Sequence, residues 1–181
     1  MASFTRLLGT VLRSLASSLP ARRAPAATGG SGTRTTTSSS RPAPLPTDAT
    51  RTVEIDSRSL GHQKLSYSPH ADARPDPGEV VWTWVPYEEN DGRGKDRPVL
   101  VLARLSANTV LGVQLTSKEH EGDLGSLELG RGPWDQTGRA SWVRLDRLFR
   151  VNDASMRREG AALDAARYAR VAEALQQRYR S

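Results

Sequence analysis

The chain has 181 residues, which allows one ordinary domain plus extensions. It contains no cysteine, which excludes a disulfide framework and a cysteine-ligated zinc site. Its three histidines are scattered without a helical pair, so we expect neither a metal nor a cofactor. The net charge of +6 arises in the N-terminal part, because residues 1–47 hold six arginines and no acidic residue. Residues 48–181 hold 20 basic and 20 acidic residues, so a nucleic-acid site there must be a local basic patch.

Residues 1–76 are predicted to form a basic, Pro/Ser/Thr-rich extension that is largely disordered, ahead of a folded domain at 77–181. Residues 4–19 are mildly amphipathic and too short to span a bilayer. A frayed basic extension is the simplest interpretation of them. Weak contact with an anionic membrane surface and an organelle transit peptide are the alternatives. Residues 51–76 carry scattered apolar side chains and are either disordered or add one marginal strand.

Short apolar segments separated by turns predict a small antiparallel barrel, closed or half-closed, of mainly β structure. The expected strands are residues 78–85, 98–103, 109–116, 141–145 and 148–151. In the first two of these strands both faces are largely apolar, which is typical of central strands.

A C-terminal helix is predicted from apolar residues at helical spacing: Tyr168, Val171, Ala172, Leu175 and Tyr179. Asp164 is its expected N-cap. The apolar stripe favours packing on the barrel, and an RNA-binding or partner-binding helix is the alternative.

Three polar elements at strand ends are candidates for one functional site. Arg97 precedes Pro98 at the start of the second strand, and Thr116 ends the third strand. Arg144 and Asp146 are two residues apart in a later strand, so they share a face. Two guanidinium groups, a hydroxyl and a carboxylate in one groove would suit metal-free cleavage of a phosphodiester, with a base for the 2′-hydroxyl and cations for the phosphate.

In their order along the chain these segments resemble the MazF/PemK toxin family over about residues 77–181. The phrases concerned are Gly78–Val85, Arg97-Pro98-Val99-Leu100-Val101, Leu115-Thr116-Ser117 and Arg144-Leu145-Asp146, together with the C-terminal helix. The resemblance implies an α+β, mainly β fold with an SH3-like antiparallel barrel. It also implies a cytoplasmic homodimer that cleaves single-stranded RNA as a metal-independent, sequence-selective endoribonuclease and leaves a cyclic phosphate. A cognate antitoxin would neutralise it, and the toxin–antitoxin complex would bind DNA.

The same resemblance implies catalytic roles for Arg97, Thr116, Arg144 and Asp146. Asp146 would be the base, and Arg144 or Arg97 would be the acid or the charge stabiliser. Because an arginine is a poor proton donor, we favour the stabilising role and leave the acid open. Further candidates for RNA binding are Arg93, Lys95, Ser117, Lys118 and Trp134.

Some features depart from the family pattern. The first loop contains the acidic residues Glu88, Glu89, Asp91 and Asp96 and no histidine. Trp134, between Arg131 and Arg139, would stack a base or, alternatively, pin a Gly-rich loop to the barrel. His120 follows the third strand, where it would shuttle a proton or lie solvated in a loop.

Two rival functions belong to other classes. The acidic first loop favours a non-catalytic barrel that binds RNA or a protein partner. A poison of DNA gyrase is a third hypothesis, and nothing at the C-terminus supports it.

Overall fold

The computed structural model of the chain describes residues 47, 49–60, 63–70, 72, 74–119 and 122–179. All of them belong to the unit Ser40–Ser181, one of two units into which the chain divides. The predictions for residues 4–19 and for His120 lie outside the described residues. In the described part, no helix has the length and apolar character needed to cross a membrane.

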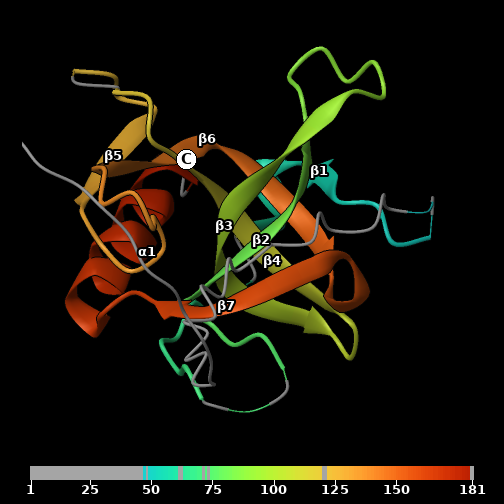
Figure 1. The fold of residues 1–181 in the computed structure, drawn as a ribbon, viewed down its shortest axis with the longest axis horizontal. Coiled ribbons are helices and arrows are strands. Elements are labelled where there is room, and N and C mark those ends of the chain that lie inside the picture. The colour runs from blue at the N-terminus through green and yellow to red at the C-terminus, as the bar shows by residue number, and fades with distance from the viewer. Residues whose placement is uncertain are drawn as a thin grey trace, which may run out of the picture. The chain divides into compact units, whose positions relative to one another are not determined.

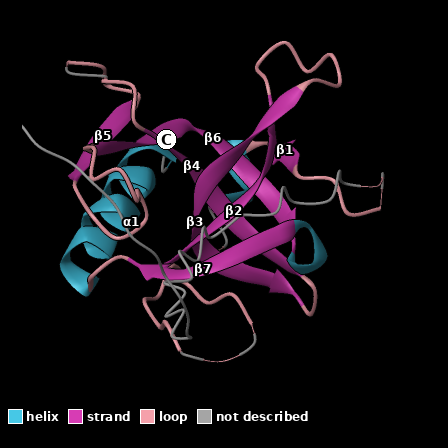
Figure 2. Cartoon of the chain, in the orientation of Figure 1, coloured by secondary structure: helices cyan, strands magenta, loops and turns pink. Residues whose placement is uncertain are grey.

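Seven strands form one antiparallel sheet in the order β1-β6-β4-β3-β2-β7, with β5 paired to β6 (Figures 1 and 2). The strands are β1 Val53–Ile55, β2 Glu79–Pro86, β3 Gly94–Ser106, β4 Thr109–Thr116, β5 Ser126–Gly130, β6 Ser141–Asn152 and β7 Met156–Ala162. Two short 3-10 helices, η1 Ser57–Leu60 and η2 Asp153–Ser155, and one α-helix, α1 Ala165–Tyr179, complete the described part. The predicted mainly β fold with a C-terminal helix is confirmed, and its sheet is not closed.

Each face of the sheet contributes to a separate apolar core. Successive side chains of a strand point to opposite faces, so Leu100 and Leu102 enter one core while Val99 and Val101 enter the other. All four are fully buried. This explains why β3 is apolar on both faces.

The first core lies between the sheet and α1, which Figure 1 shows on one side of the strands beside β5 and β6. Asp164 caps the helix, since its Oδ1 accepts the Arg167 amide hydrogen at 2.8 Å. Tyr168, Val171 and Leu175 are buried, as the periodicity predicts. The Tyr168 hydroxyl also donates to the Leu102 carbonyl at 2.6 Å, which ties α1 to β3.

The second core lies inside the curl of the sheet and consists of Val81, Val85, Val99, Val101, Val110, Phe149 and Val151. The curl brings the segment before β1 to β2, although these strands are not neighbours in the sheet. Thr52 and Thr83, both buried, join their hydroxyl groups at 3.1 Å. The open end of this inner core is where the polar residues of β3, β4 and β6 gather.

Residues before the predicted boundary at 77 also pack on the sheet. Leu60 is 4% exposed and belongs to the first core. The Tyr67 hydroxyl donates to the Leu163 carbonyl at 2.8 Å, and the Tyr67 ring lies 5.5 Å from that of Tyr168. Gly78 has a positive φ of 107°, and any side chain there would strike the Tyr67 ring. The packed unit therefore begins well before residue 77.

Two strand predictions need correction. Residues 141–145 and 148–151 are one strand, β6, whose pairing with β4 is interrupted between Val143 and Leu148. β7 was not predicted, because Met156–Ala162 carries two arginines, a glutamate and a glycine in place of an apolar pattern. It pairs with β2 at the edge of the sheet, where several of its side chains stay partly exposed.

Candidate functional site

A bend in β6 creates the site. Leu115 pairs with Val143 and Val113 with Leu148, so residues 144–147 stand opposite the single residue Gln114. Extra residues of this kind bend a strand and redirect its side chains, as β-bulges do. The bend carries Arg144 and Arg147 to the open end of the inner core, beside Gln114 and Arg97.

Around Arg144 and Arg147 lies a hollow of about 390 Å³, which we call the arginine pocket. It is lined by Pro86, Tyr87, Glu88, Glu89, Arg93, Arg97, Gln114, Arg144 and Arg147. Arg93, Arg144 and Arg147 are paired with carboxylates, so the capacity of this pocket to bind an anion depends on Arg97.

A second hollow of about 300 Å³, the threonine pocket, contains the end of β4. It is lined by Trp82, Lys95, Asp96, Arg97, Pro98, Leu115, Thr116, Ser117, Lys118, Trp134, Asp135, Arg139 and Ser141. The predicted residues Lys95, Thr116, Ser117 and Lys118 thus meet Arg97 in one pocket. The Thr116 hydroxyl accepts the Lys118 amide hydrogen at 3.1 Å, which orients it at the strand exit.

Arg97 lines both pockets and is therefore the link between them. It stands opposite Thr83 in the β2–β3 ladder and is half-buried. Within the described residues its guanidinium has no ion pair, hydrogen bond or ring contact. Its neighbour Asp96 is instead paired with Arg157 of β7 at 3.0 Å. A half-buried cation without a counter-ion is a ready partner for an added anion.

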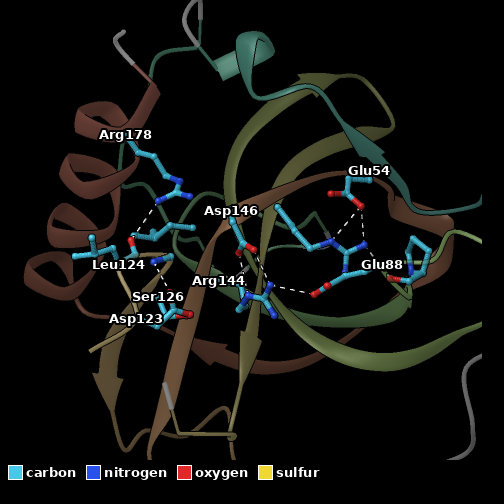
Figure 3. A network of polar contacts seen from close by, with 12 residues as sticks. Glu54, Glu88, Asp123, Leu124, Ser126, Arg144, Asp146 and Arg178 are labelled. Carbon is cyan, nitrogen blue, oxygen red and sulfur yellow. Dashed lines mark hydrogen bonds and ion pairs between the residues drawn. The ribbon is translucent and has the colours of Figure 1, made fainter. Parts of the chain in front are cut away.

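Arg144 is, by contrast, held by two carboxylates. Its Nε and Nη2 donate to the two carboxylate oxygens of Asp146 at 2.9 and 2.6 Å, and Nη2 also donates to Glu88 at 3.0 Å. Figure 3 shows Arg144 between these two carboxylates, which come from β6 itself and from the β2–β3 loop. The prediction that Arg144 and Asp146 share a face is confirmed by this contact.

These contacts shift both pKa values. The hydrogen bonds to Asp146, opposed by burial, raise the pKa of Arg144 above its ordinary value. Burial alone would raise the pKa of Asp146, but the hydrogen bonds and charge of Arg144 outweigh it and hold that pKa below its ordinary value. Asp146 is therefore a carboxylate at neutral pH, with both oxygens already accepting hydrogen bonds.

Arg147 is a site residue that sequence reasoning missed. It is only 8% exposed, and its guanidinium donates to Glu54 of β1 at 2.6 and 3.1 Å and to the Pro86 carbonyl at 3.1 Å. Figure 3 shows the Glu54 contact next to the Arg144 network. The sequence signal that could have found it is a basic residue between two apolar segments. In the structure this is the point where β6 bends.

Gln114 was missed as well. It is 5% exposed and lines the arginine pocket, in a strand that is otherwise apolar from Val110 to Leu115. A single amide in the middle of a buried strand was the signal that could have found it, because buried polar groups normally have a partner.

The threonine pocket is also cationic. Lys95, Arg97, Lys118 and Arg139 line it, and each of its two acids has a basic partner, although Asp96 Oδ1 is buried without a hydrogen-bond partner among the described residues. Asp96 pairs with Arg157, and Asp135 with Arg139 at 3.2 Å. Arg93 differs from the other candidates, because it is exposed at the arginine pocket and held by Asp91 of its own loop at 2.7 Å.

Trp134 does not offer its ring for base stacking. It is 1% exposed and belongs to the first core, although it also lines the threonine pocket. The guanidinium of Arg167 from α1 lies 5.7 Å from the ring centre, and a side chain at Gly132 would collide with the ring. Its burial therefore favours the second alternative from the sequence, in which Trp134 pins the β5–β6 loop to the rest of the fold.

Among the described residues, no group of three or more His, Asp or Glu side chains is placed to hold a metal ion. The groups that the site does offer are guanidinium, ammonium and hydroxyl groups. These bind and neutralise a phosphate, and an unpaired arginine next to a threonine hydroxyl gives two donors to its oxygens.

Comparison with known families identifies a match. The sequence model of a family described as "PemK-like, MazF-like toxin of type II toxin-antitoxin system" matches residues 76–179, which is more than half of the chain. No curated protein matches the chain.

Several solved structures are similar. A MazE–MazF complex from Deinococcus radiodurans has 22% identity and a TM-score of 0.45, covering 59% of this chain and 96% of that one. MazF alone from the same organism has 21% identity and a TM-score of 0.45, covering 61% and 100%. The Mycobacterium tuberculosis toxin MazF-mt6 has 18% identity and a TM-score of 0.40, covering 55% and 93%.

Proposed function

Because the chain belongs to the family of PemK-like, MazF-like toxins of type II toxin–antitoxin systems, we propose that it is a sequence-selective endoribonuclease that cuts single-stranded RNA without a metal ion. The observation that carries this proposal is the position of Arg97. Its guanidinium has no partner in the described part of the chain and lies in one pocket with Thr116 and in the next with Arg144.

In this reaction the 2′-oxygen of a ribose attacks the adjacent phosphorus atom, and the bond from phosphorus to the 5′-oxygen breaks. The 2′-hydroxyl loses its proton to a base, and the leaving 5′-oxygen gains one. The products are a 2′,3′-cyclic phosphate and a 5′-hydroxyl. Negative charge grows on the phosphate oxygens, so donors aimed at those oxygens lower the barrier.

We assign the phosphate to Arg97 and the Thr116 hydroxyl. Arg97 would supply charge and two parallel N–H donors, and Thr116, which lines the same pocket, would supply one O–H donor. Lys95, Lys118 and Ser117 line the same pocket and would hold the neighbouring phosphates of the strand.

Arg144 stabilises the developing charge from the arginine pocket, and Asp146 fixes the orientation of its guanidinium. As a base, Asp146 is disfavoured by its lowered pKa and by the two hydrogen bonds that its oxygens accept. It accepts the 2′-proton only if RNA binding releases the Arg144 contact.

Family membership also gives the proposed partners. A cognate antitoxin would occupy the cationic pockets and neutralise the enzyme, and the complex of the two would bind DNA. We further propose a homodimer that acts in the cytoplasm, where its RNA substrates are found.

The test is to incubate the purified full-length chain with defined single-stranded RNA in EDTA, followed by end-group analysis of the fragments. We expect cuts at a restricted set of sequences, with cyclic phosphate and 5′-hydroxyl ends. A requirement for added metal, or products with 5′-phosphate ends, would contradict the proposal.

The second candidate is a barrel that binds RNA without cutting it. The contact of Glu88 with Arg144 favours it, because a loop carboxylate then occupies a cation that catalysis needs. RNA binding that weakens steeply with salt, with no products in EDTA or in magnesium, would support this candidate over the enzyme.

A further inference from the structure

Gln114 is a largely buried residue whose amide has no hydrogen-bond partner among the described residues. Its side chain lines the arginine pocket, is 5% exposed, and makes no hydrogen bond to any other described residue. Its polar atoms are not among the fully buried, unpartnered atoms of the described residues, so they open toward the pocket that the residue lines. The carbonyl oxygen and the amino group of Gln114 are thus available to a molecule in the pocket.

The position of Gln114 relates it to the proposed phosphate site. Gln114 pairs with Val99 across the β3–β4 ladder, and Arg97 lies two residues before Val99 on the same face. Arg97 and Gln114 are therefore diagonal neighbours, and both line the arginine pocket. A nucleotide whose phosphate is bound by Arg97 would place its base within reach of Gln114.

The pocket has the dimensions and the walls for a base. Its volume of about 390 Å³ lies within the range of small-molecule sites. The half-buried ring of Tyr87 forms part of the wall, and aromatic rings stack on bases.

The polar groups around Gln114 favour one kind of base. Arg144 and Arg147 are already engaged by carboxylates, so they offer few free donors to a base carbonyl. The exposed carboxylate of Glu89 lines the same pocket and only accepts hydrogen bonds. An exocyclic amino group fits these acceptors, whereas a carbonyl oxygen at that position would be repelled.

We propose that the arginine pocket binds an adenine next to the scissile phosphate, and that Gln114 is the residue that selects it. The amide oxygen accepts from the 6-amino group, and the amide nitrogen donates to N7, which is the two-point pairing that glutamine makes with adenine. The proposal rests on the proposed RNA cleavage for its substrate class, but it is tested by binding.

The experiment uses the full-length chain and uridine oligomers with 2′-fluoro sugars, which lack the attacking hydroxyl and are not cut. One central position carries adenine, guanine, cytosine, uracil, purine or 7-deazaadenine, and affinity is measured by fluorescence anisotropy. Purine lacks the 6-amino group, and 7-deazaadenine lacks the N7 acceptor.

We expect the adenine oligomer to bind about tenfold more tightly than those with guanine, cytosine or uracil, and each analogue to lose several-fold in affinity. Equal binding of the four natural bases, or preference for any base other than adenine, would overturn the proposal. These affinity measurements require only the wild-type chain.

Gln114→Leu keeps the volume and removes both polar atoms, so it should bind all six oligomers alike. Gln136→Leu, an exposed position in the β5–β6 loop that lines neither pocket, is the matched control and should keep the adenine preference. An adenine preference that survives in Gln114→Leu would overturn the assignment of the residue.

Cleavage of the all-ribose adenine oligomer in EDTA is measured in parallel. An adenine preference that disappears in Gln114→Leu, together with no cleavage by the wild type, would uphold the base site and refute the endoribonuclease. If the rate of cleavage is the same for every base and is unchanged in Gln114→Leu, the endoribonuclease is upheld and the base site is refuted.

Discussion

Arg144 and Asp146, two residues apart on the bent strand β6, form a two-point ion pair with N–O distances of 2.9 and 2.6 Å. The pair leaves both oxygens of Asp146 engaged by the same guanidinium. A carboxylate in this arrangement orients an arginine far better than it accepts a proton. The relationship therefore favours an orienting role for Asp146, whereas the sequence resemblance implies the role of the base.

Asp146→Asn should lower the rate of RNA cleavage about tenfold without removing the acidic limb of the pH–rate profile. The asparagine keeps one acceptor for Arg144 but loses the charge that holds it. The measurement is kcat/KM against pH for both chains, on one RNA substrate. A profile that loses its acidic limb in the variant would identify Asp146 as the base.

The pH dependence of the Arg144–Asp146 contact follows from the lowered pKa of Asp146. A carboxyl group whose pKa is lower in the folded state stabilises the fold above its unfolded pKa of about 3.9. That stability is lost as the pH falls through the lowered folded value. The contact should therefore persist through neutral and mildly acidic conditions.

Glu88→Gln should strengthen the binding of a uridine oligomer about two- to fivefold at low salt, because it frees Arg144 from a loop carboxylate. The gain should shrink as salt is added, since exposed charges are screened. Anisotropy titrations at two salt concentrations measure it. Glu128→Gln removes the same charge from β5, outside both pockets, and should leave the affinity nearly unchanged. An equal gain in both variants would mean that only net charge matters.

Tyr168 should make the fold sensitive to alkali. Burial raises the pKa of its hydroxyl to about 12 from an ordinary value of 10.0, so the unfolded state ionises first. The stabilisation is complete below pH 10 and is lost as the pH rises toward 12. Thermal unfolding followed by circular dichroism should show the melting temperature falling across that interval.

Tyr168→Phe is the matched variant for this prediction. It removes the hydrogen bond to Leu102 and should lower the melting temperature at neutral pH. Above pH 10, the melting temperature of this variant should fall less steeply with pH than that of the wild type. Parallel curves for the two chains would show that another group governs the alkaline transition.

Trp134→Ala should destabilise the fold by about 3–5 kcal/mol, because it empties a buried site of the first core. Urea unfolding measures the change, and Leu124→Ala at a residue that is 91% exposed serves as the control, with little effect. A Trp134→Ala chain of unchanged stability with weakened RNA binding would restore the stacking role that burial argues against.

The regular part of the fold could be predicted because its residues follow the periodicity of each element. β2, β3, β4 and α1 all carry continuous or periodic apolar residues, and Asp164 caps the helix as expected. β7 was not predicted, and β1 was only one of two alternatives for residues 51–76. Met156–Ala162 is polar, and Val53–Ile55 is only three residues long, so both depend on pairing with a neighbouring strand.

Site residues could be predicted where their position along a strand determines which residues lie beside them. Arg97 and Thr116 lie at facing ends of neighbouring strands, and they line one pocket. Arg147, Gln114 and Glu54 were not assigned from the sequence, because their surroundings depend on the bend in β6 and the pairing of β1, which are contacts between distant segments. Trp134 was ambiguous for a related reason, since its burial depends on α1 covering the β5–β6 loop.

The central claim is that Arg97 holds the scissile phosphate, and single-turnover cleavage of RNA in EDTA by Arg97→Ala tests it most directly. Arg150→Ala is the matched control, since Arg150 is exposed on β6 and lines neither pocket. We predict that Arg97→Ala loses a factor of about a hundred or more in rate, as removal of a transition-state donor does, while Arg150→Ala cuts at the wild-type rate. Cleavage by Arg97→Ala at the wild-type rate would contradict the account.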